Sequence, residues 1–244
     1  MQKVLSTMRK AIQKYNLIQD GDKIAVGVSG GKDSLVLLKA LKDFQKFNLY
    51  KFDIIAVTID IYSGNVDYTN LKKFCKDLDV ELYIEKTDIQ HIVFDLRKEK
   101  NPCSLCAKMR RGALNSVCNK LGCNKLALAH HLQDVITTFF MSLIYEGRLS
   151  TMMPKSYMSN TQVTLIRPLY LTHEHKIVSA SQKMPILKSK CPADQDSKRK
   201  DIKEYIERLY SEFPDSKKRI EHAILSPESY NLLNTVYPFK KEED

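Results

Sequence analysis

Short β-branched apolar runs alternate with helical segments as far as Tyr145, and this alternation constrains the fold more than any other feature. The apolar runs, read as strands, are 23–28, 52–61, 80–85 and 125–129. The segments with helical spacing are 34–47, 67–78, 104–121 and 134–145. Strands that alternate with helices of this length predict βαβ units. We therefore expect an α/β fold, with a parallel Rossmann-like sheet flanked by helices on both faces.

Helical additions are expected at both ends of this core. Residues 1–20 are predicted to form an N-terminal helical segment, 21–172 the α/β domain and 173–244 a C-terminal helical extension. A last strand is predicted at 164–171, at an edge of the sheet because Pro168 has no amide hydrogen to donate. The predicted helices of the C-terminal part are 173–182, 197–213 and 214–225.

The charge balance indicates a polyanionic partner. The 244 residues carry 39 Lys and Arg against 29 Asp and Glu, a formal net charge of +10. Residues 100–173 hold nine of these bases and two acids, so this third of the chain has a net charge of +7. A solvated basic surface is one interpretation, and a site for a phosphate-rich ligand such as nucleic acid is the other.

The sequence has no membrane signal. No apolar run approaches the roughly 20 residues of a spanning helix, and the basic, polar N-terminus lacks the apolar core of a signal peptide. We therefore expect a cytoplasmic protein without a membrane partner. The six cysteines are then expected to be core residues, metal ligands or nucleophiles rather than a disulfide framework.

The hexapeptide Ser29-Gly30-Gly31-Lys32-Asp33-Ser34 lies between the first predicted strand and the first predicted helix. Glycines allow the backbone to approach a phosphate closely, and the free N–H groups at a helix start point at the anion. Lys32 and the two serines add charge and hydrogen-bond donors. The motif is not a Walker A loop, because Val26 stands where that loop needs glycine and Asp33 follows the lysine.

Two cysteine segments are candidates for a metal site. Cys103 and Cys106 form a CxxC at the start of a predicted helix, where two thiolates can bind one metal. Cys191 precedes a proline in a basic, irregular segment where packing does not require a cysteine. Three cysteines can hold an iron–sulfur cluster or a zinc ion, and their spacing does not decide between the two. Cys75, Cys118 and Cys123 are interpreted as core residues.

His130 and Asp134 follow the fourth predicted strand at its carboxyl end, where open α/β sheets bind ligands. Asp60 ends the second strand in the same way, although it can equally be a simple strand-end residue. A histidine in such a position is often structural. With Asp134 beside it and the hexapeptide upstream, we favour a role for His130 in nucleotide binding.

SGGKDS after the first strand of an α/β sheet resembles the signature of the PP-loop ATP pyrophosphatases. These enzymes cleave ATP between the α and β phosphates and adenylate a substrate. The resemblance implies that residues 29–34 bind the pyrophosphate portion of ATP, that Asp60 borders the nucleotide, and that Mg²⁺ assists.

Three further motifs, CSLCAKMRRG, LALAHHLQDVITTFFMSLIYEGRL and IRPLY, occur in the order of the tRNA 2-thiocytidine synthetase branch. This resemblance covers about 3–227 and implies ATP-dependent thiolation of tRNA. It implies a [4Fe-4S] cluster held by Cys103, Cys106 and Cys191, with Arg110 and Asp134 also in the catalytic set. A sulfur donor, either a cysteine desulfurase or free sulfide, and a homodimer are further expectations.

One departure from that branch keeps other functions open. Gln133 stands where the branch has an aspartate, while Asp134 is kept. The alternatives are a zinc-containing adenylating enzyme similar to lysidine synthetases, a cluster-dependent RNA desulfidase, and an RNA-binding protein with a degenerate ATP site. The sequence does not identify the tRNA or the direction of sulfur flow.

Overall fold

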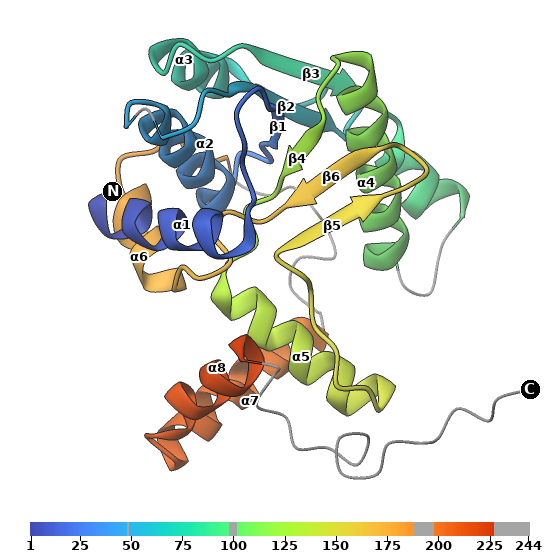
Figure 1. Cartoon of the computed structure of the whole chain (residues 1–244). Coiled ribbons are helices and arrows are strands. Elements are labelled where there is room, and N and C mark those ends of the chain that lie inside the picture. Colours follow the sequence, from blue (N-terminus) through green and yellow to red (C-terminus); the bar gives the residue numbers. More distant parts are fainter. Residues whose placement is uncertain (48, 98–101, 188–197, 227–244) are drawn as a thin grey trace, which may run out of the picture. The chain divides into compact units, whose positions relative to one another are not determined.

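The computed structural model describes residues 1–47, 49–97, 102–187 and 198–226 (Figure 1). Its strands are β1 (Lys23–Gly27), β2 (Asp53–Asp60), β3 (Leu82–Lys86), β4 (Lys125–Ala127), β5 (Lys155–Met158) and β6 (Val163–Ile166). Its α-helices are α1 (Gln2–Tyr15), α2 (Lys32–Gln45), α3 (Thr69–Asp77), α4 (Pro102–Lys120), α5 (Leu132–Glu146), α6 (Glu174–Ser181), α7 (Lys198–Glu212) and α8 (Ser216–Leu225). A short π-helical segment, η1 (His91–Leu96), was not expected from the sequence.

The strands form one six-stranded sheet in the order β3-β2-β1-β4-β6-β5. All neighbouring pairs are parallel except β5 and β6. The predicted α/β fold is therefore confirmed. The predicted edge position of the last strand is wrong, because β6 lies between β4 and β5. β6 ends at Ile166, so Pro168 falls outside the hydrogen-bonded ladder, and the unpredicted strand β5 forms that edge.

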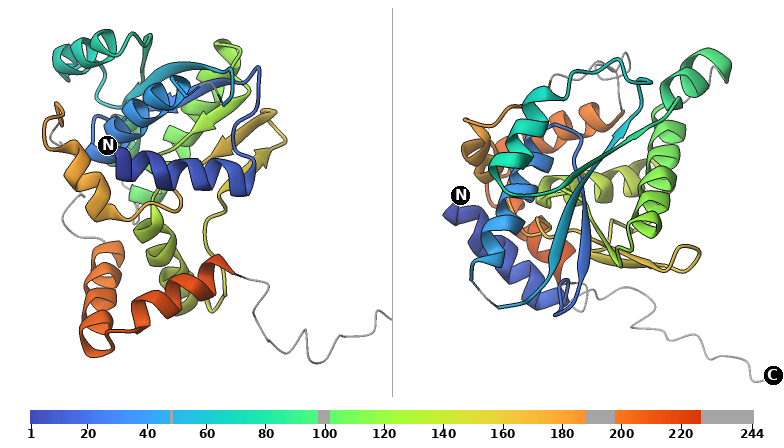
Figure 2. Two further views of the ribbon diagram at one scale, coloured as in Figure 1. Left: turned by 60° about the vertical axis from the view of Figure 1, so that its left-hand side comes forward. Right: turned by 90° about the horizontal axis from the view of Figure 1, so that it is seen from above.

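Side chains alternate between the two faces of the sheet, as the pleat requires. On one face, Ile24 and Val26 of β1 pack in the cluster that also contains buried residues of α1, α2, α3 and α6. On the other face, Ala25 of β1 and Leu126 of β4 pack with Val117 and Cys118 of α4. Figure 2 shows these helices on either side of the sheet. Burial on both faces explains the continuous apolar runs of β1 and β2.

The described residues fall into two compact units, one within 1–135 and 153–196 and the other within 136–152 and 197–244. This division differs from the boundary that we predicted at residue 173. Helix α6 packs against α1 and α2 and so lies in the first unit, whereas most of α5 lies in the second. In the described part of the chain, no helix is long and apolar enough to cross a membrane.

Candidate active site

The loop between β1 and α2 places backbone amides at the carboxyl edge of the sheet. The Thr58 hydroxyl donates to the Val28 carbonyl over 2.8 Å and fixes the end of β1. The chain then turns at Gly30, whose φ of +81° favours glycine. Gly31 is the N-cap of α2, and no side chain caps this helix start. The N–H groups of the first turn therefore remain available for an anion.

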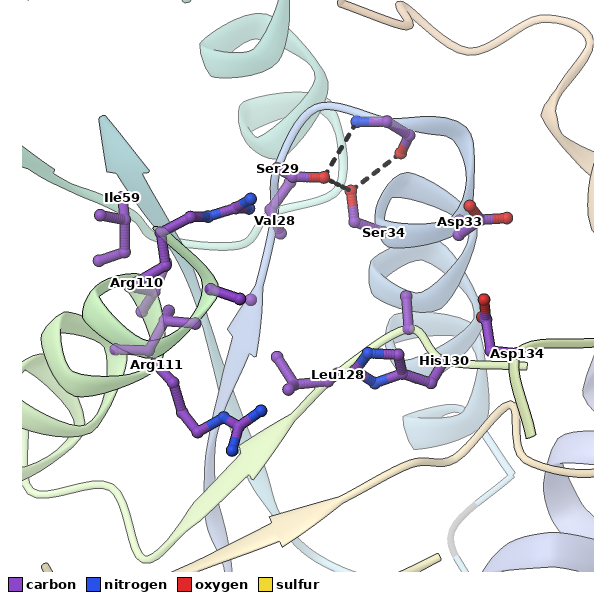
Figure 3. A pocket seen from close by; sticks show the side chains of 16 residues that line it. Val28, Ser29, Asp33, Ser34, Ile59, Arg110, Arg111, Leu128, His130 and Asp134 are labelled. Atoms are coloured by element: carbon purple, nitrogen blue, oxygen red, sulfur yellow. Dashed lines mark hydrogen bonds between the residues drawn. The ribbon is translucent and has the colours of Figure 1, made fainter. Parts of the chain in front are cut away.

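Two serine hydroxyls stabilise the loop from inside (Figure 3). Ser34 donates to the Gly31 carbonyl over 2.9 Å, and its oxygen lies 3.4 Å from the Ser29 hydroxyl. The Gly31 amide in turn donates to the Ser29 hydroxyl oxygen over 3.4 Å. Asp33 lies in the first turn of α2, where a carboxylate is favoured by the helix dipole. The loop thus has a defined shape before any ligand binds.

Lys32 does not line the pocket described below but forms two ion pairs beside it. Its Nζ lies 2.8 Å from Asp33 Oδ1 and 2.8 Å from Glu174 Oε1 of α6. Burial lowers the pKa of Lys32, but the hydrogen bonds and charges of Asp33 and Glu174 outweigh this effect, so the pKa is raised. The lysine is therefore a fixed cation at the margin of the loop.

Gly30 also lies outside the pocket, because Leu187 covers it. The Leu187 amide donates to the Gly30 carbonyl over 2.9 Å. A Cβ at Gly30 would lie only 2.6 Å from Leu187 Cδ1 and 2.9 Å from its Cβ. The backbone at Leu187 is therefore in direct contact with the loop, four residues before Cys191.

A cavity of about 330 Å³ opens beside the loop. Its lining comes from the carboxyl ends of β1, β2 and β4, the start of α2, and α4. The lining residues are Gly27, Val28, Ser29, Gly31, Asp33, Ser34, Val57, Ile59, Ala107, Arg110, Arg111, Leu114, Leu128, Ala129, His130 and Asp134. The structure thus brings Ser29, Gly31, Asp33, Ser34, Arg110, His130 and Asp134 of the predicted site around one cavity.

Helix α4 connects this cavity to the CxxC. Cys103 is exposed and Cys106 is half-buried, and both lie near the start of α4. Ala107, the residue after Cys106, lines the cavity, and Arg110 follows one turn later. Arg110 and Arg111 extend in opposite directions: Arg110 toward Ser29, and Arg111 away from the loop, below Leu128 in Figure 3.

The two histidines after β4 have different surroundings. His130 lines the cavity, whereas His131 is 2% exposed and lies behind it. His131 Nε2 is 3.5 Å from Asp134 Oδ2 and 3.8 Å from Asp33 Oδ1. The His131 amide also donates to Asp134 Oδ2 over 3.0 Å. His131 therefore contacts both carboxylates that line the cavity, and carboxylates are suited to Mg²⁺. Our sequence analysis did not assign a role to His131.

Asp60 does not line the cavity. Its side chain is 1% exposed and accepts hydrogen bonds from the amides of Tyr62 and Gly64, each over 2.9 Å. Burial and the nearby Asp60 carboxylate raise the pKa of Tyr68 to about 12. In this structure the Asp60 carboxylate stabilises the turn after β2 rather than facing the nucleotide site.

The remaining cysteines separate into two groups. Burial raises the pKa of Cys75 to about 11 and, together with the nearby Cys123 thiol, that of Cys118 to about 12. Burial also raises the pKa of Cys123. These thiols stay protonated and unreactive at neutral pH. Cys191 lies outside the described residues, and within those residues no three metal-ligating groups come together.

The family of the chain follows from comparison with known proteins. A family model described as the PP-loop domain matches residues 2–206. The chain belongs to the PP-loop family. Its loop at 29–34 lies within the matched residues, at the carboxyl edge of the parallel sheet and at the start of α2.

Relatives of this PP-loop protein include tRNA-cytidine(32) 2-sulfurtransferases. The protein from Geobacter sulfurreducens is 33% identical over 239 residues, which cover 95% of this chain and 92% of the relative. The protein from Pseudomonas syringae pv. tomato is 36% identical over 201 residues, which cover 81% of this chain and 73% of the relative.

Solved structures show the same architecture. The U34-tRNA thiolase NcsA of Methanococcus maripaludis, solved with its [4Fe-4S] cluster, superposes with a TM-score of 0.73. It is 26% identical, and the match covers 93% of this chain and 80% of that one. An NH₃-dependent NAD synthetase of Campylobacter jejuni, 15% identical with a TM-score of 0.50, shares the fold; the match covers 93% of this chain and 90% of that one.

Proposed function

We propose that this PP-loop protein is an ATP-dependent tRNA sulfurtransferase that converts a cytidine of tRNA to 2-thiocytidine. The observation that carries the proposal is the position of the CxxC helix. Helix α4 begins with Cys103 and Cys106 and, one turn later, lines the same cavity as the phosphate loop. Relatives named tRNA-cytidine(32) 2-sulfurtransferase match almost the whole chain.

The first half of the reaction uses ATP and Mg²⁺. The carbonyl oxygen of the base attacks the α-phosphorus, and the bond from that phosphorus to the pyrophosphate oxygen breaks. The amides at the start of α2 and the hydroxyls of Ser29 and Ser34 stabilise the leaving pyrophosphate. Asp33 and Asp134 are the carboxylates available to Mg²⁺. Arg110 extends toward this end of the cavity and offsets negative charge there.

The second half requires sulfur at the activated carbon, and the cysteines fit a [4Fe-4S] cluster. Cys103 and Cys106 lie three residues apart near the start of α4, a spacing that allows two thiolates to bind one cluster. The Leu187 amide donates to the Gly30 carbonyl of the phosphate loop, and Cys191 follows Leu187 by four residues in the sequence, so we include Cys191 in the proposed ligand set. When bound, such a cluster supplies the sulfur-transfer chemistry that replaces the adenylated oxygen, which leaves with AMP.

Partners beyond tRNA are part of the proposal. A sulfur donor, either a cysteine desulfurase or free sulfide, must replace the sulfur that each turnover consumes. We assign the reaction to the cytoplasm, where tRNA is found, and we retain the homodimer as a proposal.

The test is thiolation of tRNA by the anaerobically reconstituted full-length protein. We expect 2-thiocytidine and AMP only when ATP, Mg²⁺, sulfide and tRNA are all present, measured by mass spectrometry of nucleosides. Cys103→Ala should lose the 2-thiocytidine. Cys123→Ala, which alters a buried thiol away from the cavity, is the matched control and should keep it.

Each alternative predicts a different result. 2-Thiouridine in place of 2-thiocytidine would contradict the assignment of the base. AMP release without any thionucleoside, together with bound zinc, would indicate an adenylating enzyme similar to lysidine synthetases. Loss of sulfur from thiolated RNA would indicate a desulfidase, and tRNA binding without AMP release would indicate an RNA-binding protein.

A further inference from the structure

Three arginines lie at the cavity or beside it, and in the described part of the chain none of them pairs with a carboxylate. Arg110 and Arg111 line the cavity from α4, and Arg167 directly follows β6. Lys32 and Lys125, in contrast, each lie within 2.8 Å of a carboxylate oxygen. Within the described residues, no carboxylate pairs with these three arginines, in contrast to the two lysines.

Arg167 is held firmly although its guanidinium is only partly satisfied. Its Nη1 donates to the Met153 carbonyl, and its amide donates to the Pro154 carbonyl over 2.9 Å. Its Nε is buried and has no hydrogen-bond partner. A buried donor without a partner costs free energy, so this guanidinium is suited to a further acceptor.

Arg111 and Arg167 come from elements that pack against each other, α4 and the end of β6. Helix α4 packs against β6, and Arg167 follows β6 at the same edge of the sheet as Leu128 and Ala129, which line the cavity. Burial, followed by repulsion from Arg111, lowers the pKa of Arg167 to about 10. The Arg167 guanidinium is nevertheless charged at neutral pH. Two neighbouring like charges are stabilised by an anion between them.

The position of the pair indicates which anion it binds. The phosphate loop and Arg110 lie at one end of the cavity, whereas Arg111 extends away from the loop (Figure 3). Arg111 is also exposed, so a phosphate on a large molecule can reach it. We propose that Arg111 and Arg167 form a subsite for one phosphodiester of the RNA substrate, distinct from the site of the ATP phosphates; this rests on the proposed function.

The test measures binding of a fluorescent unmodified tRNA transcript and of α,β-methylene-ATP to the full-length protein. We expect Arg111→Gln and Arg167→Gln each to weaken tRNA binding about tenfold. The slope of log affinity against log salt should fall by about 1, as for the loss of one phosphate contact. Affinity for the ATP analogue should change less than twofold.

The double variant and a distant control make the test specific. Because both arginines would bind the same phosphate, Arg111→Gln with Arg167→Gln should lose little more than either single variant. Arg9→Gln removes one exposed charge from α1, on the other face of the sheet, and should change tRNA affinity less than twofold. An equal loss in Arg9→Gln would mean that only net charge matters and would overturn the subsite.

Other outcomes also decide against the subsite. Unchanged tRNA affinity in Arg111→Gln would overturn it, and so would an equal loss of affinity for the ATP analogue, which would assign the pair to ATP. Arg111 is exposed, so its variant remains decisive if Arg167→Gln unfolds. Binding is measured without turnover, so a protein that binds tRNA through this pair but makes no thionucleoside would contradict the proposed function alone.

Discussion

At the scale of single residues, position 30 requires glycine for two separate reasons. Its φ of +81° is unfavourable for a residue with a Cβ, and the Leu187 side chain occupies the space that a Cβ would need. Gly21 has nearly the same φ, +79°, but a Cβ added there would meet nothing within 4 Å. The chain therefore provides a matched pair that separates backbone strain from steric exclusion.

We predict that Gly30→Ala and Gly21→Ala each lose about 1 kcal/mol of unfolding free energy from backbone strain. Gly30→Ala should lose more, and should weaken binding of α,β-methylene-ATP at least tenfold, because Leu187 must move and the loop shifts with it. Urea unfolding and calorimetric titration measure these effects. Normal nucleotide binding by Gly30→Ala would contradict the role that we give to the contact.

The thiols give a second prediction at this scale. In cluster-free protein at pH 8, iodoacetamide should modify Cys103 rapidly, because it is exposed. Cys75, Cys118 and Cys123 should react only on unfolding, since burial raises their pKa values. Reconstitution with iron and sulfide should protect Cys103, Cys106 and Cys191 in peptide mapping. Continued labelling of Cys191 would exclude it from the ligand set.

At the scale of elements, α6 influences the phosphate loop from outside the cavity. Glu174 in its first turn binds Lys32, which the family resemblance assigns to the pyrophosphate of ATP. The pKa of Lys32 is raised, so the stabilisation from pairing is complete at neutral pH and is lost only as the pH rises above about 10.5. We therefore expect Glu174 to compete with a phosphate for Lys32 near neutral pH.

We predict that Glu174→Gln tightens binding of α,β-methylene-ATP about threefold, because the neutral amide competes less for Lys32. The unfolding free energy should fall by about 0.5 kcal/mol, as is typical for a partly exposed pair. Asp43→Asn, which removes the partner of Lys39 on the same helix α2, is the control and should leave nucleotide affinity unchanged. Weaker binding in Glu174→Gln would mean that Glu174 orients the lysine.

The sequence predicted most elements, because apolar periodicity reports burial directly. The parallel core, the phosphate loop and the CxxC helix follow from such local patterns. Strand β5 was missed because its four residues are half-exposed or exposed and carry no apolar alternation. The positions of Leu187, Glu174 and Arg167 beside the site depend on how distant segments pack, and no local pattern contains that information.

At the scale of the whole molecule, the second unit contains buried apolar side chains and an aromatic contact between its two segments. Ile202 and Ile206 of α7 are each 4% exposed. Phe140 of α5 contacts Tyr205, with ring centroids 6.4 Å apart. Phe140 and Tyr205 are more than 60 positions apart, and no local sequence pattern shows that α5 and α7 belong to one unit.

We predict that Ile206→Ala costs about 2–3 kcal/mol within the second unit, as expected for truncation of a buried isoleucine. Hydrogen exchange should rise within 136–152 and 198–226 while α2 and the phosphate loop stay protected. Leu38→Ala, in the core of the first unit, is the control and should raise exchange in β1 and α2 instead. Equal exchange throughout both units would show that they unfold together.

The contact between Gly30 and Leu187 also has an evolutionary consequence. The Leu187 side chain occupies the space that a Cβ at position 30 would need. Substitutions at positions 30 and 187 should therefore not be independent. Relatives that keep a bulky residue at the position of Leu187 should retain glycine at the position of Gly30. Selection for an ATP site therefore extends to a residue more than 150 positions further along the chain.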